Sequence, residues 1–236
     1  MPDPAVSPQE QEDETMAHAA FDGIQTLAWM RDFTQSVYAT EAELTALDQR
    51  AGDGDFGANL AAGVRASGLR CDRMEGPTGP AETLGAMADA FLDEIGGTSG
   101  PLFGLLFQAL SRAAAGSGPD LTTASLAEGA ARGLAAIRRV GDASPGDKTL
   151  VDALAPAAAA LLATKDSPPA EALAGAAEAA WEGVRDTASL TARMGRASYL
   201  GQRATGIPDP GAVGVALLFA SAGGTVDTLA HHVIIG

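Results

Sequence analysis

The sequence has few of the residues that several common classes of protein require. It contains one cysteine, Cys71, so no disulfide can form within the chain and a reducing compartment is expected. The 15 basic residues are outnumbered by 30 acidic ones, and the net charge of −15 argues against a nucleic-acid partner and against a basic helix on a membrane surface. No apolar run is long enough to span a bilayer, and no signal peptide is recognisable at the start. These features predict a cytoplasmic protein.

Aromatic residues make up only 5% of the chain, and Val and Ile are also sparse, whereas Ala, Leu and Gly dominate. That balance favours helix over sheet, because Ala and Leu lose little on entering a helix and strands prefer β-branched and aromatic residues. Residues 1–18 are acidic and contain proline, so they are expected to be a disordered extension of one domain over 19–236. Helical spacing and Gly/Pro/Asp punctuation predict an all-α bundle of eight helices, at about 24–47, 57–69, 81–95, 101–115, 123–140, 150–163, 169–193 and from 209 onward.

An acidic loop follows the first predicted helix. Asp48, Asp53 and Asp55 fall within eight residues, and the glycines between and after them let the backbone fold tightly. Two unit charges 4 Å apart repel by about 1 kcal/mol in water and about 4 kcal/mol near a protein surface. A hard divalent cation, Mg²⁺ or Ca²⁺, would remove that repulsion. The alternative interpretation is a solvated acidic turn whose side chains point apart.

Two glycine-rich segments stand directly before helices. Gly96–Pro101 carries the hydroxyls of Thr98 and Ser99, and Gly57–Asn59 begins the helix after the acidic loop. Exposed N–H groups at a helix start form a cradle for anions such as phosphate. The alternative for the first segment is a helix end followed by ordinary Thr/Ser capping. A cation beside two such helix starts is what a nucleotide di- or triphosphate requires.

Two later loops have the same character. In 141–149, Lys148 could reach a phosphate, and Asp147 could instead cap the next helix. In 195–211, the guanidinium of Arg196 suits phosphate oxygens, although a surface ion pair is the alternative. Asp209 and Pro210 form a typical helix start, with a capping carboxylate before a first-turn proline.

Four segments together resemble a known family: LDQRAGDGDFGANLAAG, GGTSGPLFG, PGDKTLVDAL and GRASYLGQRATGIPDPGA. Their order and spacing resemble the signature segments of the DhaL-type nucleotide-binding subunit of dihydroxyacetone kinase, from about Leu47 to the end of the eighth helix. The resemblance implies a closed barrel of eight antiparallel helices with the nucleotide at its loop-bearing end.

The resemblance also implies roles for particular residues. Asp48, Asp53 and Asp55 would bind two magnesium ions, and with Lys148 they form the expected catalytic group. The residues expected to bind ADP or ATP are Phe56, Gly57, Ala58, Asn59, Thr98, Ser99, Gly141, Leu150, Arg196, Asp209, Pro210 and Gly211. Many members of the family have His at the position of Phe56, and often Thr at that of Ala58. Phe56 can offer phosphate only its backbone N–H, so one side-chain contact is missing, and nucleotide binding is expected to survive.

The function that follows is phosphoryl transfer from a Mg-bound nucleotide to dihydroxyacetone, or to a related keto-sugar of three or four carbons, held on a DhaK-type partner subunit. The phosphoryl donor is left open between a DhaM-type protein of the phosphotransferase system and ATP, and so is homodimer formation. The alternative from another class is a regulatory module that binds ADP–Mg but transfers nothing.

Overall fold

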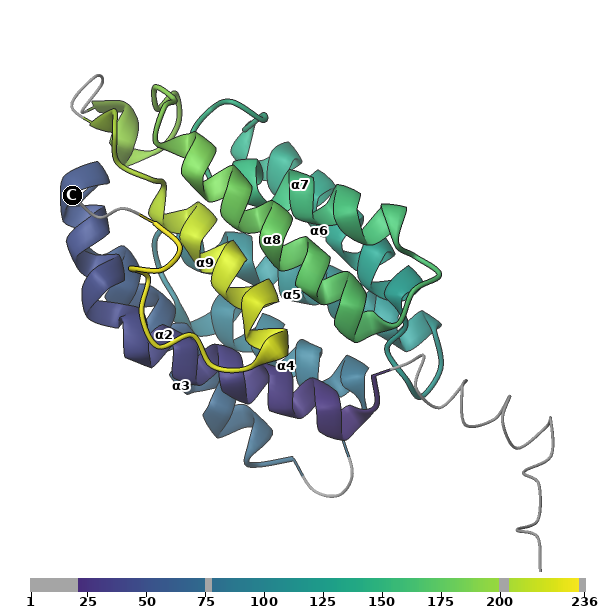
Figure 1. The fold of residues 1–236 in the computed structure, drawn as a ribbon. Helices are drawn as coiled ribbons and strands as arrows, with labels where there is room; N and C mark the ends of the chain where they lie inside the picture. Colours follow the sequence, from purple (N-terminus) through teal and green to yellow (C-terminus); the bar gives the residue numbers. More distant parts are fainter. Residues whose placement is uncertain (1–20, 75–77, 200–203, 234–236) are drawn as a thin grey trace, which may run out of the picture.

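The computed structural model describes residues 21–74, 78–199 and 204–233, and most of these residues are helical (Figure 1). The predicted extension at 1–18 lies outside the described residues, as do Ile234 and Ile235. The α-helices of the described part are α2 (Gly23–Ala51), α3 (Phe56–Cys71), α4 (Pro80–Glu94), α5 (Ser99–Gly116), α6 (Thr123–Gly141), α7 (Val151–Ala163), α8 (Pro169–Thr187) and α9 (Pro210–Ala220). Two short 3₁₀ turns, Arg196–Tyr199 and Ser221–Gly223, follow α8 and α9.

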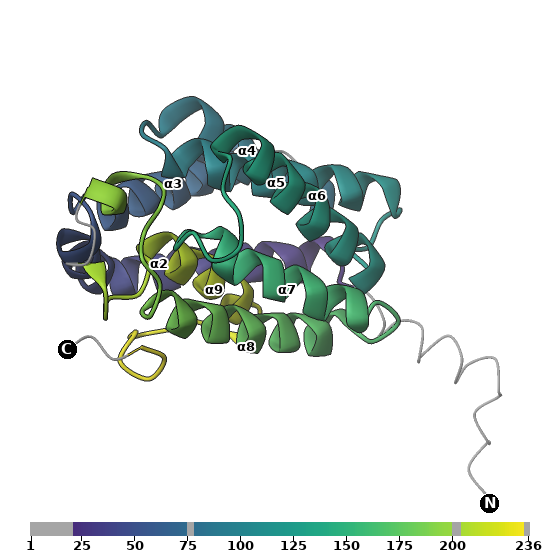
Figure 2. The same ribbon diagram turned by 90° about the horizontal axis from the view of Figure 1, so that it is seen from above.

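The helices close into a ring. Each helix from α2 to α8 packs against the next one in the sequence, and α9 packs against α2. Figure 2 shows α9 lying among α2, α7 and α8, with which it is in contact. The predicted fold class, an all-α closed barrel of eight helices, is therefore confirmed.

Short polar signals in the sequence explain where several helices begin. Asp22 caps α2 by accepting a hydrogen bond from the Gln25 N–H at 2.7 Å, and the Gln25 side-chain oxygen accepts one from the Asp22 N–H at 3.0 Å. Asp209 caps α9 by accepting from the Ala212 N–H at 2.8 Å. Proline occupies the first position of α4, α8 and α9, where its missing N–H costs nothing.

The core is built around α9 and a cluster of phenylalanines. Residues Ala212 to Phe219 of α9 are buried on every face, as expected for a helix without a polar side. Phe56, Phe103, Phe91 and Phe107 form a chain of tilted ring contacts with centroids 5.5 to 6.3 Å apart. This rigid interior supports the loops at one end of the barrel.

Two predicted features of the helix ends were wrong. The seventh helix was expected to continue to about 193, but α8 ends at Thr187, where tertiary hydrogen bonds replace the next turn. Asp147 does not cap α7, which begins at Val151; its carboxylate instead accepts from the Ser144 N–H. The Asp152 carboxylate accepts hydrogen bonds from the N–H groups of Gly146 and Thr149, and these bonds hold the loop in place.

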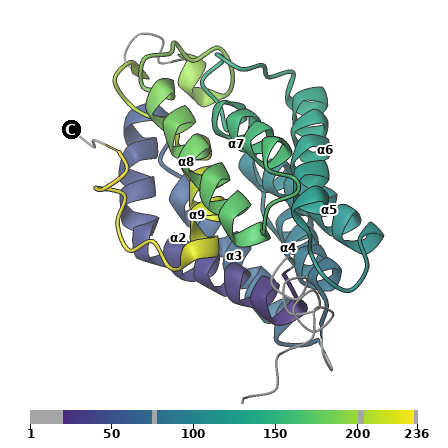
Figure 3. The same ribbon diagram turned by 45° about the vertical axis from the view of Figure 1, so that its right-hand side comes forward.

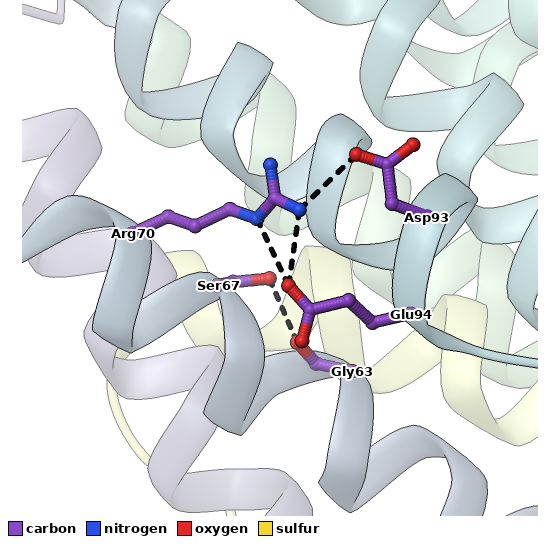
Figure 4. A network of polar contacts seen from close by, with 5 residues as sticks. All are labelled: Gly63, Ser67, Arg70, Asp93 and Glu94. Atoms are coloured by element: carbon purple, nitrogen blue, oxygen red, sulfur yellow. Dashed lines mark hydrogen bonds and ion pairs between the residues drawn. The ribbon is translucent and has the colours of Figure 1, made fainter.

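The outer surface carries exposed ion pairs of modest energetic value. Arg70 of α3 donates to Asp93 and Glu94 at the end of α4, at 3.0 to 3.2 Å (Figure 4). Exposed pairs of this kind contribute about 0–1 kcal/mol each. Within the described ranges, no helix combines the length and the apolar character needed to cross a membrane.

Candidate functional site

Three aspartates meet at one end of the barrel. Asp48 lies in the last turn of α2, Asp55 stands at the N-cap of α3, and Asp53 lies in the loop between these helices. One carboxylate oxygen from each lies within 4.8 Å of the others. Gly54 between them has φ +83°, a left-handed conformation that glycine adopts without strain. The structure thus brings together the three carboxylates expected from the sequence.

Asp48 is the most buried of the three, and neighbouring backbone groups hold its carboxylate in place. Asp48 Oδ2 accepts a hydrogen bond from the Phe56 N–H at 3.0 Å, which ties the end of α2 to the start of α3. Gly52 lies so close to Asp48 Oδ1 that a Cβ at this position would overlap with it. The carboxylate is therefore fixed by its surroundings, while Asp53 and Asp55 are exposed.

These residues fit a magnesium ion. The donor set is oxygen only, it carries three negative charges, and it leaves an open side toward solvent, which suits a hard cation that keeps some of its water and binds phosphate oxygens. When bound, the ion would supply the positive charge that neutralises the carboxylates and a polyphosphate together.

The aspartates form one wall of a cleft of about 250 Å³. Three more loops line it, those before α5, before α7 and before α9, and in Figure 3 the α6–α7 and α8–α9 loops lie together at the upper end of the barrel. The predicted site residues that line the cleft are Asp48, Asp53, Asp55, Phe56, Asn59, Thr98, Ser99, Gly141, Lys148, Leu150, Asp209, Pro210 and Gly211.

Three predicted residues are placed otherwise. Gly57 is buried between helices, and a Cβ there would lie 2.6 Å from the Glu41 carbonyl oxygen, so it serves the contact of α3 with α2. Ala58 is exposed and does not line the cleft. Arg196 begins the 3₁₀ turn, and its side chain lies outside the described part of the structure.

Two helix starts face the cleft. Asp55 before α3 and Thr98 before α5 make no side-chain capping hydrogen bond, although at the start of α3 the Phe56 N–H donates to Asp48. Gly97, with φ +74°, turns the chain into α5. Uncapped first-turn N–H groups and the helix dipole attract anions, and here two such helix starts flank the carboxylate group.

Burial shifts the acid–base behaviour of two groups in the floor of the cleft. It raises the pKa of Asp209 to about 7, an effect opposed by the Ala212 N–H and by the charge of Lys148. It lowers the pKa of Lys148, against the opposing charges of Asp209 and Asp152. The Lys148 amino group donates to the carbonyls of Thr187 and Ile207, contacts that the sequence did not indicate.

An apolar wall of the cleft was also missed from the sequence. Leu102, Ile137, Val151 and Met194 line it. The first three lie near helix ends and Met194 lies in the α8–α9 connection, positions that give no signal separating them from ordinary core residues. The cleft therefore has apolar as well as anion-binding residues, a combination suited to a base and a polyphosphate.

Comparison with known proteins gives a consistent result. Residues 50–223 match the model of the DAK2 domain. The chain is 38% identical over 201 residues to the L-erythrulose 1-kinase of Mycolicibacterium smegmatis, covering 84% of this chain and 34% of that enzyme. It is 34% identical over 197 residues to the ADP-binding subunit DhaL of the PTS-dependent dihydroxyacetone kinase of Lactococcus lactis, covering 82% of this chain and 93% of that subunit.

A solved structure shares the fold. The dihydroxyacetone kinase of C. freundii in complex with AMP-PNP and Mg²⁺ aligns with a TM-score of 0.63 at 25% identity, over 94% of this chain and 36% of that one. Its native form gives 0.64 at 26% identity. The chain thus spans about a third of the length of this kinase and of the erythrulose kinase.

Proposed function

The chain belongs to the DAK2 domain family, and on that premise we propose that it is the nucleotide-binding component of a kinase for a small keto-sugar. The observation that carries the proposal is the meeting of Asp48, Asp53 and Asp55 within 4.8 Å beside two uncapped helix starts. A relative that matches over nearly its whole length is named as an ADP-binding subunit, and a structural relative contains AMP-PNP and Mg²⁺.

Each part of the cleft has a task in this proposal. The three aspartates would hold magnesium, two ions as expected for the family, which supplies positive charge to the phosphates. The first-turn N–H groups of α5 donate to phosphate oxygens, the positive end of the α3 dipole adds to their attraction, and Leu102, Ile137 and Val151 pack on the base. Catalysis in phosphoryl transfer consists mostly of positioning and charge stabilisation, and these residues provide both.

The acceptor is proposed to be dihydroxyacetone or a four-carbon keto-sugar such as erythrulose. Both kinds of sugar appear in the names of relatives at 31% to 38% identity. A DhaK-type partner would present the sugar at the mouth of the cleft, as expected for a DhaL-type subunit. A phosphoryl donor that is either a DhaM-type protein or ATP, a homodimer and a cytoplasmic location complete the proposal.

The test of the metal site is the substitution Asp53→Asn. It keeps the shape of the side chain and removes one charge, so the affinity for ADP in the presence of Mg²⁺ should fall by roughly 100-fold or more, as for loss of a ligand or its close support. Isothermal titration calorimetry measures it. Asp89→Asn, an exposed residue of α4, is the control for the change in net charge. Affinity unchanged within about threefold in Asp53→Asn would refute the metal site.

Transfer is tested separately from binding. The protein is mixed with a candidate DhaK-type subunit, a keto-sugar and either ATP or a phosphoenolpyruvate-driven donor system, and the sugar phosphate is measured by mass spectrometry. Formation with one donor identifies the kinase type. Tight Mg–ADP binding without transfer in either system would favour the regulatory module.

A further inference from the structure

Lys148 is the least exposed charged residue near the cleft. The chain contains two lysines, Lys148 and Lys165. Lys165 is exposed, whereas Lys148 is 1% exposed and adopts a left-handed backbone conformation with φ 61°. Residues other than glycine and asparagine rarely adopt that backbone conformation. Burying an ammonium group is also unfavourable unless its N–H donors form hydrogen bonds. Both features indicate that the lysine has a specific task.

The amino group of Lys148 joins two points that are distant in the sequence. Its Nζ donates to the carbonyl of Thr187 and, at 2.6 Å, to the carbonyl of Ile207. Thr187 is the last residue of α8, where carbonyls lack a partner within the helix. Ile207 stands just before α9. Lys148 therefore bridges the two ends of the connection between α8 and α9.

The two ends of this connection, Thr187–Ala188 and Gly206–Asp209, are here called the neck, and other hydrogen bonds also join them. The Asp209 N–H donates to Thr187 Oγ1 at 2.9 Å, and the Gly206 N–H donates to the Ala188 carbonyl at 2.7 Å. Arg193 is tied to the loop before α7, since its N–H donates to the Asp147 carbonyl at 3.1 Å. The α8–α9 connection is thus anchored to the segment that carries Lys148.

This connection forms part of the cleft. Met194, Gly195 and Ala197 line it from the beginning of the connection, and Asp209–Gly211 line it from the end. Gly195 has φ +62°, so the chain turns sharply there. The position of this wall depends on the neck, because Met194, Gly195 and Ala197 lie between the anchored ends at Thr187 and Ile207, and Asp209–Gly211 follow Ile207 closely.

We infer that Lys148 is a positioning residue, which ties the neck of the α8–α9 connection and so places the cleft wall that the nucleotide contacts; the inference rests on the proposed function. A direct contact with phosphate is a different role. Two of the three N–H donors of this ammonium bond to carbonyls of the neck, and the residue has almost no exposed surface, so the tie to the neck is the contact that the structure shows.

The two roles predict different effects of Lys148→Met on binding. If the substitution displaces the cleft wall, the affinities for adenosine and for Mg–ADP should fall by a similar factor, roughly tenfold, because small displacements of binding groups are costly. A lost phosphate contact weakens Mg–ADP and leaves adenosine unchanged, which would overturn the inference. Calorimetry measures Mg–ADP, its stoichiometry reports the folded fraction, and ligand-observed NMR measures adenosine. Lys165→Met is the matched control and should bind both ligands like the wild type.

Hydrogen exchange of the free protein tests the neck without any ligand. The amides of Gly206 and Asp209, which are bonded across the neck, should exchange about tenfold faster in Lys148→Met, while those of α3 to α5 stay unchanged. Unchanged exchange at both amides would refute the tie. Thr187→Val removes the hydroxyl that accepts from the Asp209 N–H and keeps the carbonyl that accepts from Lys148, so its faster exchange should be confined to Asp209. If Lys148→Met fails to fold, Lys148→Gln, whose shorter side chain keeps an N–H donor, replaces it in the comparison. A wild-type protein that binds no Mg–ADP would refute the proposed function and leave this exchange result independent.

Discussion

At the residue scale, Asp209 couples the cleft to pH. Its carboxylate caps α9, and burial raises its pKa to about 7, against an ordinary value of about 3.9. The folded protein therefore binds this proton more tightly than the unfolded chain does. The resulting stabilisation is complete below pH 4 and is lost as the pH rises through about 7.

Asp209→Asn tests this coupling, because asparagine keeps the capping oxygen but does not titrate. Relative to the variant, the wild type should lose roughly 1–3 kcal/mol of unfolding free energy between pH 5 and pH 8. Urea unfolding in the absence of metal measures the difference at each pH. The exposed Asp166→Asn is the control. A difference that stays constant, or that grows in favour of the wild type at pH 8, would contradict the assignment.

How far the sequence predicts a site residue depends on the range of the interaction. Asp48, Asp53 and Asp55 were predicted to meet because a tight glycine-containing loop confines them within eight residues. The partners of Lys148 were not, since Thr187 and Ile207 lie 39 and 59 positions further along the chain. Met194 was missed for a related reason, because it becomes part of the cleft wall only after the α8–α9 connection folds back.

At the element scale, the contact between α7 and α8 depends on a proline and a glycine. Pro156 inside α7 has no N–H to donate to the Asp152 carbonyl one turn earlier. Gly183 of α8 packs directly on that carbonyl, so closely that a Cβ would overlap with its oxygen. The two helices therefore approach each other where α7 lacks a hydrogen bond.

Gly183→Ala should destabilise the protein by about 1–3 kcal/mol, the usual cost of overpacking, although alanine favours helix. Gly175→Ala, in the same helix with no atom within 4 Å of the new Cβ, should be neutral or stabilise by up to about 1 kcal/mol. Chemical denaturation of both variants measures the contrast. Equal stability of the two variants would show that the helices can separate without penalty.

The sequence predicted the eight α-helices of the described residues, and most of their boundaries, because Gly, Pro and capping residues act locally. The boundary that failed, the end of α8, is set by contacts from elsewhere in the chain. Thr187 bonds to the Asp209 N–H and to Lys148, and these bonds hold the chain away from a further helical turn. The helix propensity of residues 188–193 does not depend on these long-range hydrogen bonds, so it could not predict where α8 ends.

At the scale of the whole molecule, closing the ring brings the cleft together. The seam between α2 and the C-terminal part is fixed by the Trp29 Nε1–H, which donates to the Leu218 carbonyl at 2.7 Å, and by the contact of Ser36 with Ser221 at 2.8 Å. Asp48 lies on one side of that seam and Asp209 on the other. A ligand that contacts both sides therefore stabilises the closed barrel as a unit.

This arrangement makes stabilisation by nucleotide dependent on metal. Without Mg²⁺, ADP brings further negative charge to three carboxylates in a chain of net charge −15, so ADP with EDTA should raise the Tm little. With Mg²⁺, ADP at 100 times its Kd should stabilise the fold by about 2.7 kcal/mol. At about 2–4 °C per kcal/mol for a chain of this size, the Tm rises by roughly 5–10 °C. Differential scanning fluorimetry with ADP, Mg²⁺ and both together measures this, and equal shifts with and without Mg²⁺ would mean that the aspartates do not act through a cation.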